Sequence, residues 1–217
     1  TPKPSSAASD VYKRQGEVTP AGEILASEKY PSTVVDQRSA AEKIKTAIRS
    51  YLQQHVIHGD LIGIGICVVG RVNTEQGEWL EIHPSLSDPI FLAEEITQAF
   101  QLPCWLTNDV SGAALAESIL GIGQETGNFV YINIGTGIAA RVVADNHVIK
   151  GGNFNAGEVG HMVVDMMSDD LCSCGRKGCV ELFSSGLGMH NQTVKFATEY
   201  PDTILTIEED RLSLIHI

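Results

Sequence analysis

Residues 161–181 read HMVVDMMSDDLCSCGRKGCVE and bring one imidazole and three thiols into a short segment, with the spacing H-x10-C-x-C-x4-C. Four nitrogen and sulfur ligands are what a closed tetrahedral zinc site requires. The glycines between the last two cysteines allow the tight turn that converging sulfurs need. We therefore predict a structural zinc ion on His161, Cys172, Cys174 and Cys179. The alternatives are inert reduced thiols and, less favoured, disulfides.

Upstream of this cluster, apolar strands alternate with helices, which is typical of an α/β protein. Residues 61–69 form an apolar run bounded by glycines, for which we expect a central parallel strand buried on both faces. The capping-box pattern from Ser39 to Glu42 predicts a helix that continues to residue 54. The other expected elements are a hairpin end at 17–32, strands at 79–82, 103–107, 128–134 and 138–144, and helices at 90–100 and 111–120.

Four residues in this part of the chain are expected to be buried. Trp79 and Trp105 lie in predicted strands and are interpreted as core residues. Cys67 and Cys104 also lie in apolar strands, where a free cysteine behaves as a small buried hydrophobic residue.

The two ends of the chain carry hexapeptides that complementary DNA strands can encode. Residues 10–15 can be encoded by gatgtgtataagagacag, and the reverse complement of that string encodes residues 212–217. This inverted repeat resembles a sequencing adaptor that was translated together with the gene. We interpret residues 1–15 and 212–217 as artefact and exclude them from the fold prediction. The native segment 16–211 is then expected to be truncated on both sides; a genuine disordered tail at each end is the alternative.

The composition supports a buried core and argues against two kinds of partner. Hydrophobic residues make up 43% of the chain, and the formal net charge is −12. A nucleic-acid surface is not expected, because phosphate contacts need lysine and arginine. No apolar run approaches the length of a membrane span. Because the cysteines are grouped as metal ligands rather than spread along the chain, we expect a reducing, cytoplasmic compartment.

Asn108 and Asp109 stand where a buried strand meets a helix. In open α/β sheets, ligand-binding groups gather at the carboxyl ends of strands. Asp109 could accept a proton from a substrate hydroxyl while Asn108 holds a neighbouring one. Asp and Asn are also preferred helix N-caps. Capping and catalysis are therefore equally open, and the two residues need not share one role.

A second candidate site is the turn Gly135-Thr136-Gly137, which follows the strand at 128–134. Glycines allow a phosphate to approach backbone N–H groups, and the threonine hydroxyl adds a donor. The motif is short, and the next segment is strand-like. A plain β-hairpin turn is therefore the alternative.

Glu158 and Glu181 stand on either side of the thiol cluster in the sequence. Two carboxylates held by a metal-stiffened loop could bind vicinal hydroxyls through charge-assisted hydrogen bonds. The alternative is a pair of solvated surface acids, since the chain is acidic throughout. The metal itself is expected to be structural, because four protein ligands leave no open position for water.

Taken together, these motifs resemble the ROK family, which groups bacterial sugar kinases with sugar-responsive repressors. The resemblance covers nearly all of residues 16–211. Its motifs are the segments 63–70, 107–109, 134–138, 155–161 and 172–181. The last two in succession are highly specific.

The resemblance implies an actin-like (ribonuclease H-like), two-lobed sugar kinase fold of the α/β class, incomplete in this chain, with the sugar in the interlobe cleft. Residues 16–120 would form the N-terminal lobe without its first strands. Residues 121–211 would form part of the C-terminal lobe, including the zinc loop. The intact protein would be a dimer or tetramer of identical subunits, without a membrane or nucleic-acid partner for this segment.

The resemblance also implies roles for individual residues. Asp109 would be the base for ATP-dependent phosphorylation of a hexose or amino-hexose. The cofactors would be Zn²⁺ and ATP with Mg²⁺. Sugar hydroxyls would be held by Asn108, Asp109, Glu158, His161 and Glu181, and nucleotide phosphates would bind near Gly135, Thr136 and Gly137. Kinases for glucose, N-acetylglucosamine, N-acetylmannosamine, fructose and allose share these motifs.

The chain departs from the kinase pattern at several places. The Asp-Gly-Gly-Thr phosphate loop does not occur in it, and Val68-Val69-Gly70 replaces a Gly-x-Pro-Gly loop. Ala139 replaces a usual glycine and is followed by Ala140 and Arg141. We therefore expect the segment itself to be inactive, and its parent to be active.

Two other functions compete with the kinase. The sugar-sensing domain of a ROK repressor would share the zinc cluster and much of the sugar site, and would carry a helix-turn-helix upstream. The intact Asn108-Asp109 pair favours the kinase, whereas the altered glycine loops favour the repressor. A zinc-ribbon interaction module would explain the thiols alone, but the acidic charge and the α/β scaffold disfavour it.

Overall fold

The computed structural model describes residues 12–31, 36–55, 57–82, 87–197, 199, 207–208 and 211–212. The chain divides into two compact units. The N-terminal unit consists of Arg14–Phe129 and Arg141–Ala156. The C-terminal unit consists of Val130–Ala140 and Gly157–Ile217, with Thr1–Lys13 assigned to it. The lobe boundary at residue 120 stays a prediction.

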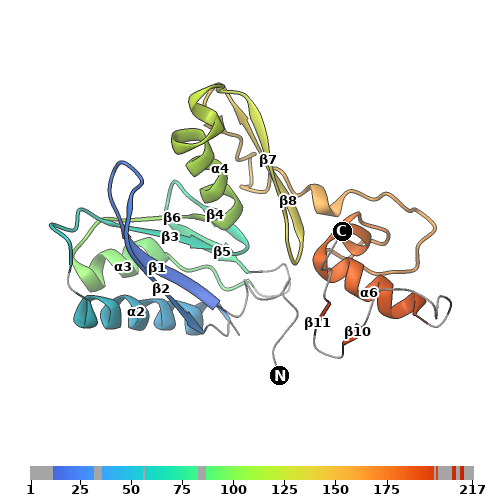
Figure 1. The fold of residues 1–217 in the computed structure, drawn as a ribbon, viewed down its shortest axis with the longest axis horizontal. Helices are drawn as coiled ribbons and strands as arrows, with labels where there is room; N and C mark the ends of the chain where they lie inside the picture. The colour runs from blue at the N-terminus through green and yellow to red at the C-terminus, as the bar shows by residue number, and fades with distance from the viewer. Residues whose placement is uncertain are drawn as a thin grey trace. The chain divides into compact units, whose positions relative to one another are not determined.

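The N-terminal unit is built on two parallel strands, β3 (Ile64–Val68) and β6 (Cys104–Asn108). Helices α2 (Gln37–Gln54) and α3 (Leu92–Phe100) lie on one side of this pair (Figure 1). Parallel pairing with helical connections confirms the α/β class that the alternating pattern predicted.

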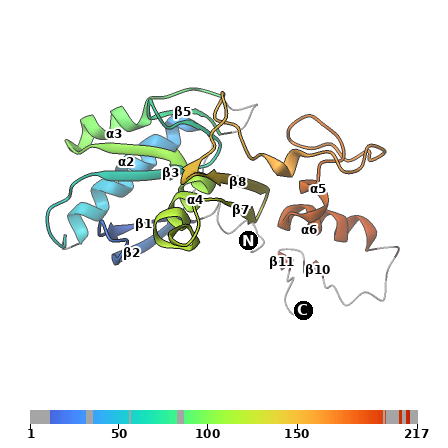
Figure 2. The ribbon, with the colours of Figure 1, turned by 90° about the horizontal axis from the view of Figure 1, so that it is seen from above.

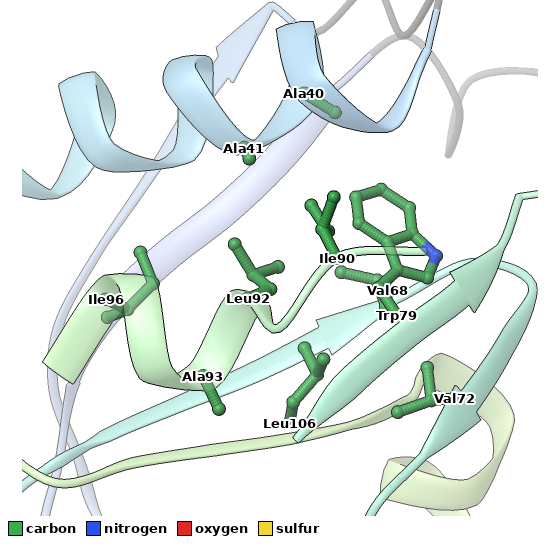
Figure 3. Close-up of a cluster of buried hydrophobic side chains, with 10 residues drawn as sticks. All are labelled: Ala40, Ala41, Val68, Val72, Trp79, Ile90, Leu92, Ala93, Ile96 and Leu106. Atoms are coloured by element: carbon green, nitrogen blue, oxygen red, sulfur yellow. The ribbon is translucent and has the colours of Figure 1, made fainter. Parts of the chain in front are cut away.

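The core of this unit lies between the helices and the strands. Figure 3 shows its side chains pointing toward one another from α2, α3 and the strands. Trp79 is 2% exposed, as expected, and its indole Nε1 donates a hydrogen bond to the Val69 carbonyl oxygen (2.9 Å). The buried cluster consists of Ala40, Ala41, Val68, Val72, Trp79, Ile90, Leu92, Ala93, Ile96 and Leu106.

The prediction that β3 is buried on both faces is wrong. Side chains alternate along a strand, so Val68 and its neighbours two residues apart face the core while Gly65 and Cys67 face the other way and are exposed. On the same outer face of β6, Trp105 is 64% exposed rather than buried. Cys104 is only partly buried, and that burial raises the pKa of its thiol to about 11.

The hairpin whose end was expected within 17–32 is formed by the paired strands β1 (Tyr12–Val18) and β2 (Ile24–Pro31), and residue 32 lies outside the described residues. Strand β1 begins earlier than predicted, at Tyr12, which is among the residues that were excluded from the fold prediction. The Gln15 amide donates to Glu28 Oε1 (2.6 Å) and to the Ala47 carbonyl oxygen (3.1 Å). The first contact joins the two strands of the hairpin, and the second ties the hairpin to α2.

Helix α2 is confirmed, but its N-cap is Asp36 rather than Ser39. The Asp36 side chain accepts a hydrogen bond from the Ser39 backbone N–H (2.7 Å). The Ser39 backbone N–H is thus one of the first-turn donors that the N-cap satisfies, whereas the capping box had placed the Ser39 side chain as the acceptor for the Glu42 N–H. Helix α3 also begins two residues later than predicted, because Ile90 pairs with Trp79 in an isolated bridge.

The N-terminal unit contains a further helix, a short hairpin and two shorter elements. Helix α4 (Asp109–Leu120) follows directly from β6. Its Gly112 lies so close to β3 that an added Cβ would be 2.6 Å from the Cys67 Sγ. The other elements are the hairpin β4 (Arg71–Asn73) and β5 (Glu78–Glu81), the turn η2 (Ile122–Gln124) and the short strand β9 (His147–Val148).

Strands β7 (Phe129–Ile134) and β8 (Ile138–Ala144) run side by side in both views (Figures 1 and 2), and β9 completes their sheet. In the C-terminal unit, helix α5 (Glu181–Ser184) is followed at once by α6 (Gly186–Phe196) (Figure 2). This unit also contains the turn η3 (Val159–His161) and the paired strands β10 (Ile207–Glu208) and β11 (Arg211–Leu212). Leu212, which was excluded as artefact, thus pairs with Ile207. Within the described residues, no helix has the length and apolarity needed to cross a membrane.

Candidate functional site

The four predicted metal ligands converge in the C-terminal unit. One possible ligand atom from each of His161, Cys172, Cys174 and Cys179 lies within 4.8 Å of all the others. His161 Nδ1 is 3.4 Å from Cys172 Sγ, and Cys174 Sγ is 3.7 Å from Cys179 Sγ. The latter distance excludes a disulfide, whose sulfur atoms would be about 2.05 Å apart. The cluster could hold a metal ion.

Backbone hydrogen bonds and glycines bring the thiols together. The Cys172 backbone N–H donates to the Arg176 carbonyl oxygen (2.8 Å), and Val180 N–H donates to the Met162 carbonyl oxygen (2.9 Å). Gly178 has a φ of +68°, and an added Cβ there would lie 1.7 Å from the Asp165 carbonyl oxygen. Only glycine fits this position, so the turn that the sequence predicted requires Gly178.

The surroundings shift the pKa values of two of the thiols in opposite directions. Burial raises the pKa of Cys179 to about 12, and hydrogen bonds with the other two thiols act in the same direction. Burial also raises the pKa of Cys174, but hydrogen bonds from the backbone and side chain of Arg176 and from the neighbouring thiols outweigh it and lower the pKa to about 7. A bound cation would favour the thiolate form of both, because metal ligation requires deprotonated thiols.

Glu181 lies against the glycine turn that was predicted to bind phosphate. Its Oε2 accepts a hydrogen bond from the Ile138 backbone N–H (2.8 Å), and an added Cβ on Gly137 would be 2.5 Å from the same oxygen. The Gly186 backbone N–H donates to the Gly135 carbonyl oxygen (2.8 Å). The start of α5 and the start of α6 therefore both contact the turn from Gly135 to Gly137, which includes Thr136.

The turn that carries Glu158 and His161 joins the same group. The Ala140 backbone N–H donates to the Gly157 carbonyl oxygen (2.8 Å), and an added Cβ on Gly160 would be 3.1 Å from Glu181 Oε2. The glycine turn, the η3 turn and the start of α5 thus meet within the C-terminal unit, next to the thiol cluster.

Asn108 and Asp109 lie at the carboxyl end of β6 in the N-terminal unit. Asn108 is the N-cap of α4, since its Oδ1 accepts from the Ser111 backbone N–H (3.1 Å). Asp109 is the first residue of the helix, and its Oδ1 accepts from the Val110 N–H (2.9 Å) and from the Asn108 amide (3.0 Å). The sequence allowed either residue to be the N-cap of the helix, and in the structure the N-cap is Asn108.

Sequence reasoning noted Arg141 only as a departure from the family pattern. In the structure its guanidinium is buried, with the residue 5% exposed. Its Nε donates to Ser111 Oγ (2.8 Å) and one terminal nitrogen donates to Asn108 Oδ1 (3.0 Å). The signal available in the sequence was a single charge inside the apolar strand 138–144, which is seldom buried without a role.

Comparison with characterised proteins finds relatives of two kinds. The xylose repressor of Bacillus subtilis is 34% identical over 146 residues, and the match covers 66% of this chain and 38% of the repressor. The glucokinase of Halalkalibacterium halodurans is 29% identical over 200 residues, with 89% of this chain and 59% of the glucokinase covered. The chain thus spans well under two thirds of the relatives it matches.

Solved structures give the same two kinds. A ROK family transcriptional regulator, a homologue of the Escherichia coli MLC protein, matches with a TM-score of 0.78 and 30% identity, covering 87% of this chain and 48% of the regulator. A ROK family glucokinase from Streptomyces griseus, solved with glucose and AMPPNP, matches with a TM-score of 0.73 and 26% identity, covering 88% of this chain and 60% of the glucokinase.

These similarities confirm the predicted actin-like sugar kinase fold, of which the chain forms a part. The model of the ROK family matches residues 15–213, which include the thiol cluster, both glycine-rich turns and the Asn108-Asp109 pair. The chain therefore belongs to the ROK family.

Proposed function

We propose that this chain is the sugar-binding core of an ATP-dependent sugar kinase that phosphorylates a hydroxyl of a hexose or amino-hexose. The observation that carries the proposal is the fixed Asp109 carboxylate at the carboxyl end of β6, with one oxygen held by Val110 N–H and by Asn108. In α/β sheets this edge is where substrates bind. The glucokinases among the relatives support the reaction class.

In this mechanism Asp109 accepts the proton of the attacking sugar hydroxyl as its oxygen approaches the γ-phosphate of ATP. Phosphoryl transfer depends mainly on positioning and charge stabilisation, with little covalent chemistry for the protein to do. A carboxylate whose other partners are already fixed loses little freedom when it meets the substrate. Asn108 contributes by holding the carboxylate.

The sugar would also be held by Glu158, His161 and Glu181, and the nucleotide phosphates by the turn at Gly135, Thr136 and Gly137. Support comes from the meeting of these segments in the C-terminal unit, where Glu181 contacts the glycine turn directly. Mg²⁺ would accompany the nucleotide and neutralise its phosphates. We expect the intact protein to act in the cytoplasm as a dimer or tetramer.

We also propose that the thiol cluster binds one structural zinc ion. Zinc–sulfur bonds of about 2.3 Å in a tetrahedron place neighbouring sulfurs about 3.8 Å apart. The 3.7 Å between Cys174 and Cys179 fits that spacing. With His161 and three thiols as ligands, the ion would have no open position. It would stiffen the loop rather than take part in the reaction.

The kinase proposal is tested in the full-length protein that contains this chain, with ATP and a panel of hexoses and amino-hexoses. Asp109→Asn keeps a polar side chain of the same shape but removes the base. Because general-base catalysis contributes about 10²–10⁴-fold, kcat should fall by about that factor while sugar binding survives. Asp60→Asn, at an exposed position of the same unit, is the matched control and should leave kcat unchanged. A near-normal kcat in Asp109→Asn would remove this residue from the mechanism.

The second candidate is the sugar-sensing domain of a ROK repressor. The xylose repressor match and the TM-score of 0.78 to a transcriptional regulator favour it, as do the altered glycine loops at Val68-Val69-Gly70 and Ala139. A full-length protein that binds sugar, transfers no phosphate to any hexose and carries a DNA-binding segment upstream would establish this function instead.

A further inference from the structure

The Glu181 carboxylate is held through one of its two oxygens. Its Oε2 accepts a hydrogen bond from the Ile138 backbone N–H (2.8 Å). Within the part of the chain that the structure describes, no group donates a hydrogen bond to Oε1. Because both oxygens of a carboxylate can accept, this partly buried side chain keeps acceptor capacity for a ligand.

The N–H that Glu181 holds comes directly after the glycine turn at 135–137. An added Cβ on Gly137 would lie 2.5 Å from Oε2 and 3.8 Å from Oε1, so the carboxylate packs against the turn with both oxygens. The Gly186 backbone N–H binds the other end of the turn, at the Gly135 carbonyl oxygen (2.8 Å). One short segment, residues 181–186, therefore clamps the turn at both ends.

This arrangement links the position of the carboxylate to that of the turn. A sugar hydroxyl bound at Oε1 would fix the plane of the carboxylate, and Oε2 would then hold the Ile138 N–H in one place. A turn that is already ordered loses less conformational entropy when a phosphate binds to it. Coupling of this kind is reciprocal, so a bound phosphate would strengthen sugar binding by the same factor.

We propose that Glu181 is a positioning residue that couples the sugar to the glycine turn: Oε1 accepts a sugar hydroxyl while Oε2 holds the turn in the conformation that receives the nucleotide phosphates. The inference rests on the proposed kinase function and adds a form of regulation to it. Nucleotide would bind tightly only when the sugar that accepts the phosphoryl group is already present.

The test is calorimetric titration of the full-length protein that contains this chain with AMPPNP and Mg²⁺. The titration is made without sugar and with saturating D-glucose, D-xylose or N-acetyl-D-glucosamine. A sugar that binds should tighten AMPPNP by at least about fivefold, the lower end of usual coupling between sites. Titration of the sugar with and without AMPPNP should give the same factor.

Two variants should change different quantities. Glu181→Gln keeps an oxygen for the Ile138 N–H but presents an amide nitrogen to the sugar, so it should weaken the sugar by at least about threefold and keep most of the coupling. Ile138→Pro removes the N–H at the first residue of a strand, where proline is tolerated, and leaves the carboxylate in place. It should leave sugar affinity near normal and reduce the coupling factor to about one.

The control is Glu199→Gln, at an exposed position of the same unit, which should change neither quantity. A purely structural role of Glu181 would instead make both variants lose sugar affinity and coupling together, and that result would overturn the inference. Sugar and AMPPNP that bind the unmodified protein independently would also overturn it, while leaving the sugar site standing.

A protein that binds sugar but no nucleotide would remove the kinase function, and the coupling is then measured on the turn itself. Sugar should slow hydrogen exchange of the Ile138 amide by at least about fivefold, because its bond to Glu181 becomes more persistent. Unchanged exchange would overturn the inference. Failure of all three sugars to bind would remove the sugar site and the coupling together.

Discussion

In the N-terminal unit the most buried side chains are large apolar ones, such as Trp79, Leu92 and Ile96, whereas in the loop 161–181 the most buried side chains are thiols. Cys172 and Cys179 are 3% and 0% exposed, while Met166 and Met167 in the same loop are 90% and 89% exposed. The loop therefore has almost no apolar core of its own. Its shape depends on backbone hydrogen bonds, glycine conformations and whatever holds the sulfurs together.

The difference teaches how each part tolerates change. An apolar core stabilises through many small contacts, and losing one side chain weakens it by a limited amount. A metal-held loop stabilises through four bonds, each of which is needed, because binding and folding of such a site are coupled. The two parts should therefore respond very differently to a single substitution, and to removal of metal.

The largest expected effect is in the loop. Cys179→Ser should abolish stoichiometric zinc binding, and hydrogen exchange should show residues 162–180 losing protection while 92–106 keep theirs. Removing zinc from the unmodified protein with a chelator should reproduce that pattern. Cys104→Ser, a cysteine of the N-terminal unit outside the cluster, should keep about one zinc per chain. Substoichiometric zinc in fresh, reduced protein, or unchanged protection in Cys179→Ser, would contradict the zinc proposal.

An intermediate effect is expected in the core. Leu92 is fully buried between α2, α3 and the strands, so Leu92→Ala should lower the free energy of unfolding by about 2–5 kcal/mol. Leu115→Ala makes the same chemical change on α4, where the side chain is 48% exposed, and should cost much less. Urea unfolding of both variants, with zinc present, gives the comparison. Equal losses would mean that Leu92 does not occupy a packed core.

The part of the fold that the sequence predicted is the part with a local signal. The apolar runs and turn residues located the strands and helices, and the H-x10-C-x-C-x4-C spacing located the cluster that converges in the structure. Burial of Trp105 could not be judged in this way. Alternation along β6 requires two faces, but only the packing of helices decides which of them is covered.

The candidate site shows the same limit. Asn108 and Asp109 were identified by their place between a strand and a helix, and the structure divides their local roles by hydrogen bonds that no spacing encodes. The partners of Arg141 lie about thirty residues upstream, on the helix that begins at Asp109 and at its cap. Contacts between distant segments depend on the tertiary fold, so no local sequence pattern could assign Arg141 to the end of β6.

The smallest expected effect concerns the contact between α4 and β3. There the effect of Gly112→Ala on the free energy of unfolding should change sign when the Cys67 sulfur is removed. Alanine is favoured over glycine inside a helix by about 1 kcal/mol, but at position 112 the new Cβ would be 2.6 Å from the Cys67 Sγ. Overpacking of this kind costs about 1–3 kcal/mol, so Gly112→Ala should be neutral to mildly destabilising.

Cys67→Ala removes the obstructing sulfur and leaves the rest of the strand unchanged. In that background Gly112→Ala should stabilise the protein by at most about 1 kcal/mol, because the helix propensity then opposes only the milder contact with Thr107 Cγ2, 3.3 Å from the added Cβ. The four unfolding free energies of this double-mutant cycle measure the contact directly, since the two residues share one interface. Additive effects would show that α4 does not approach β3 as closely as the structure has it. A change of sign would show that even the N-terminal unit, with its apolar core, depends at this helix on a glycine being small.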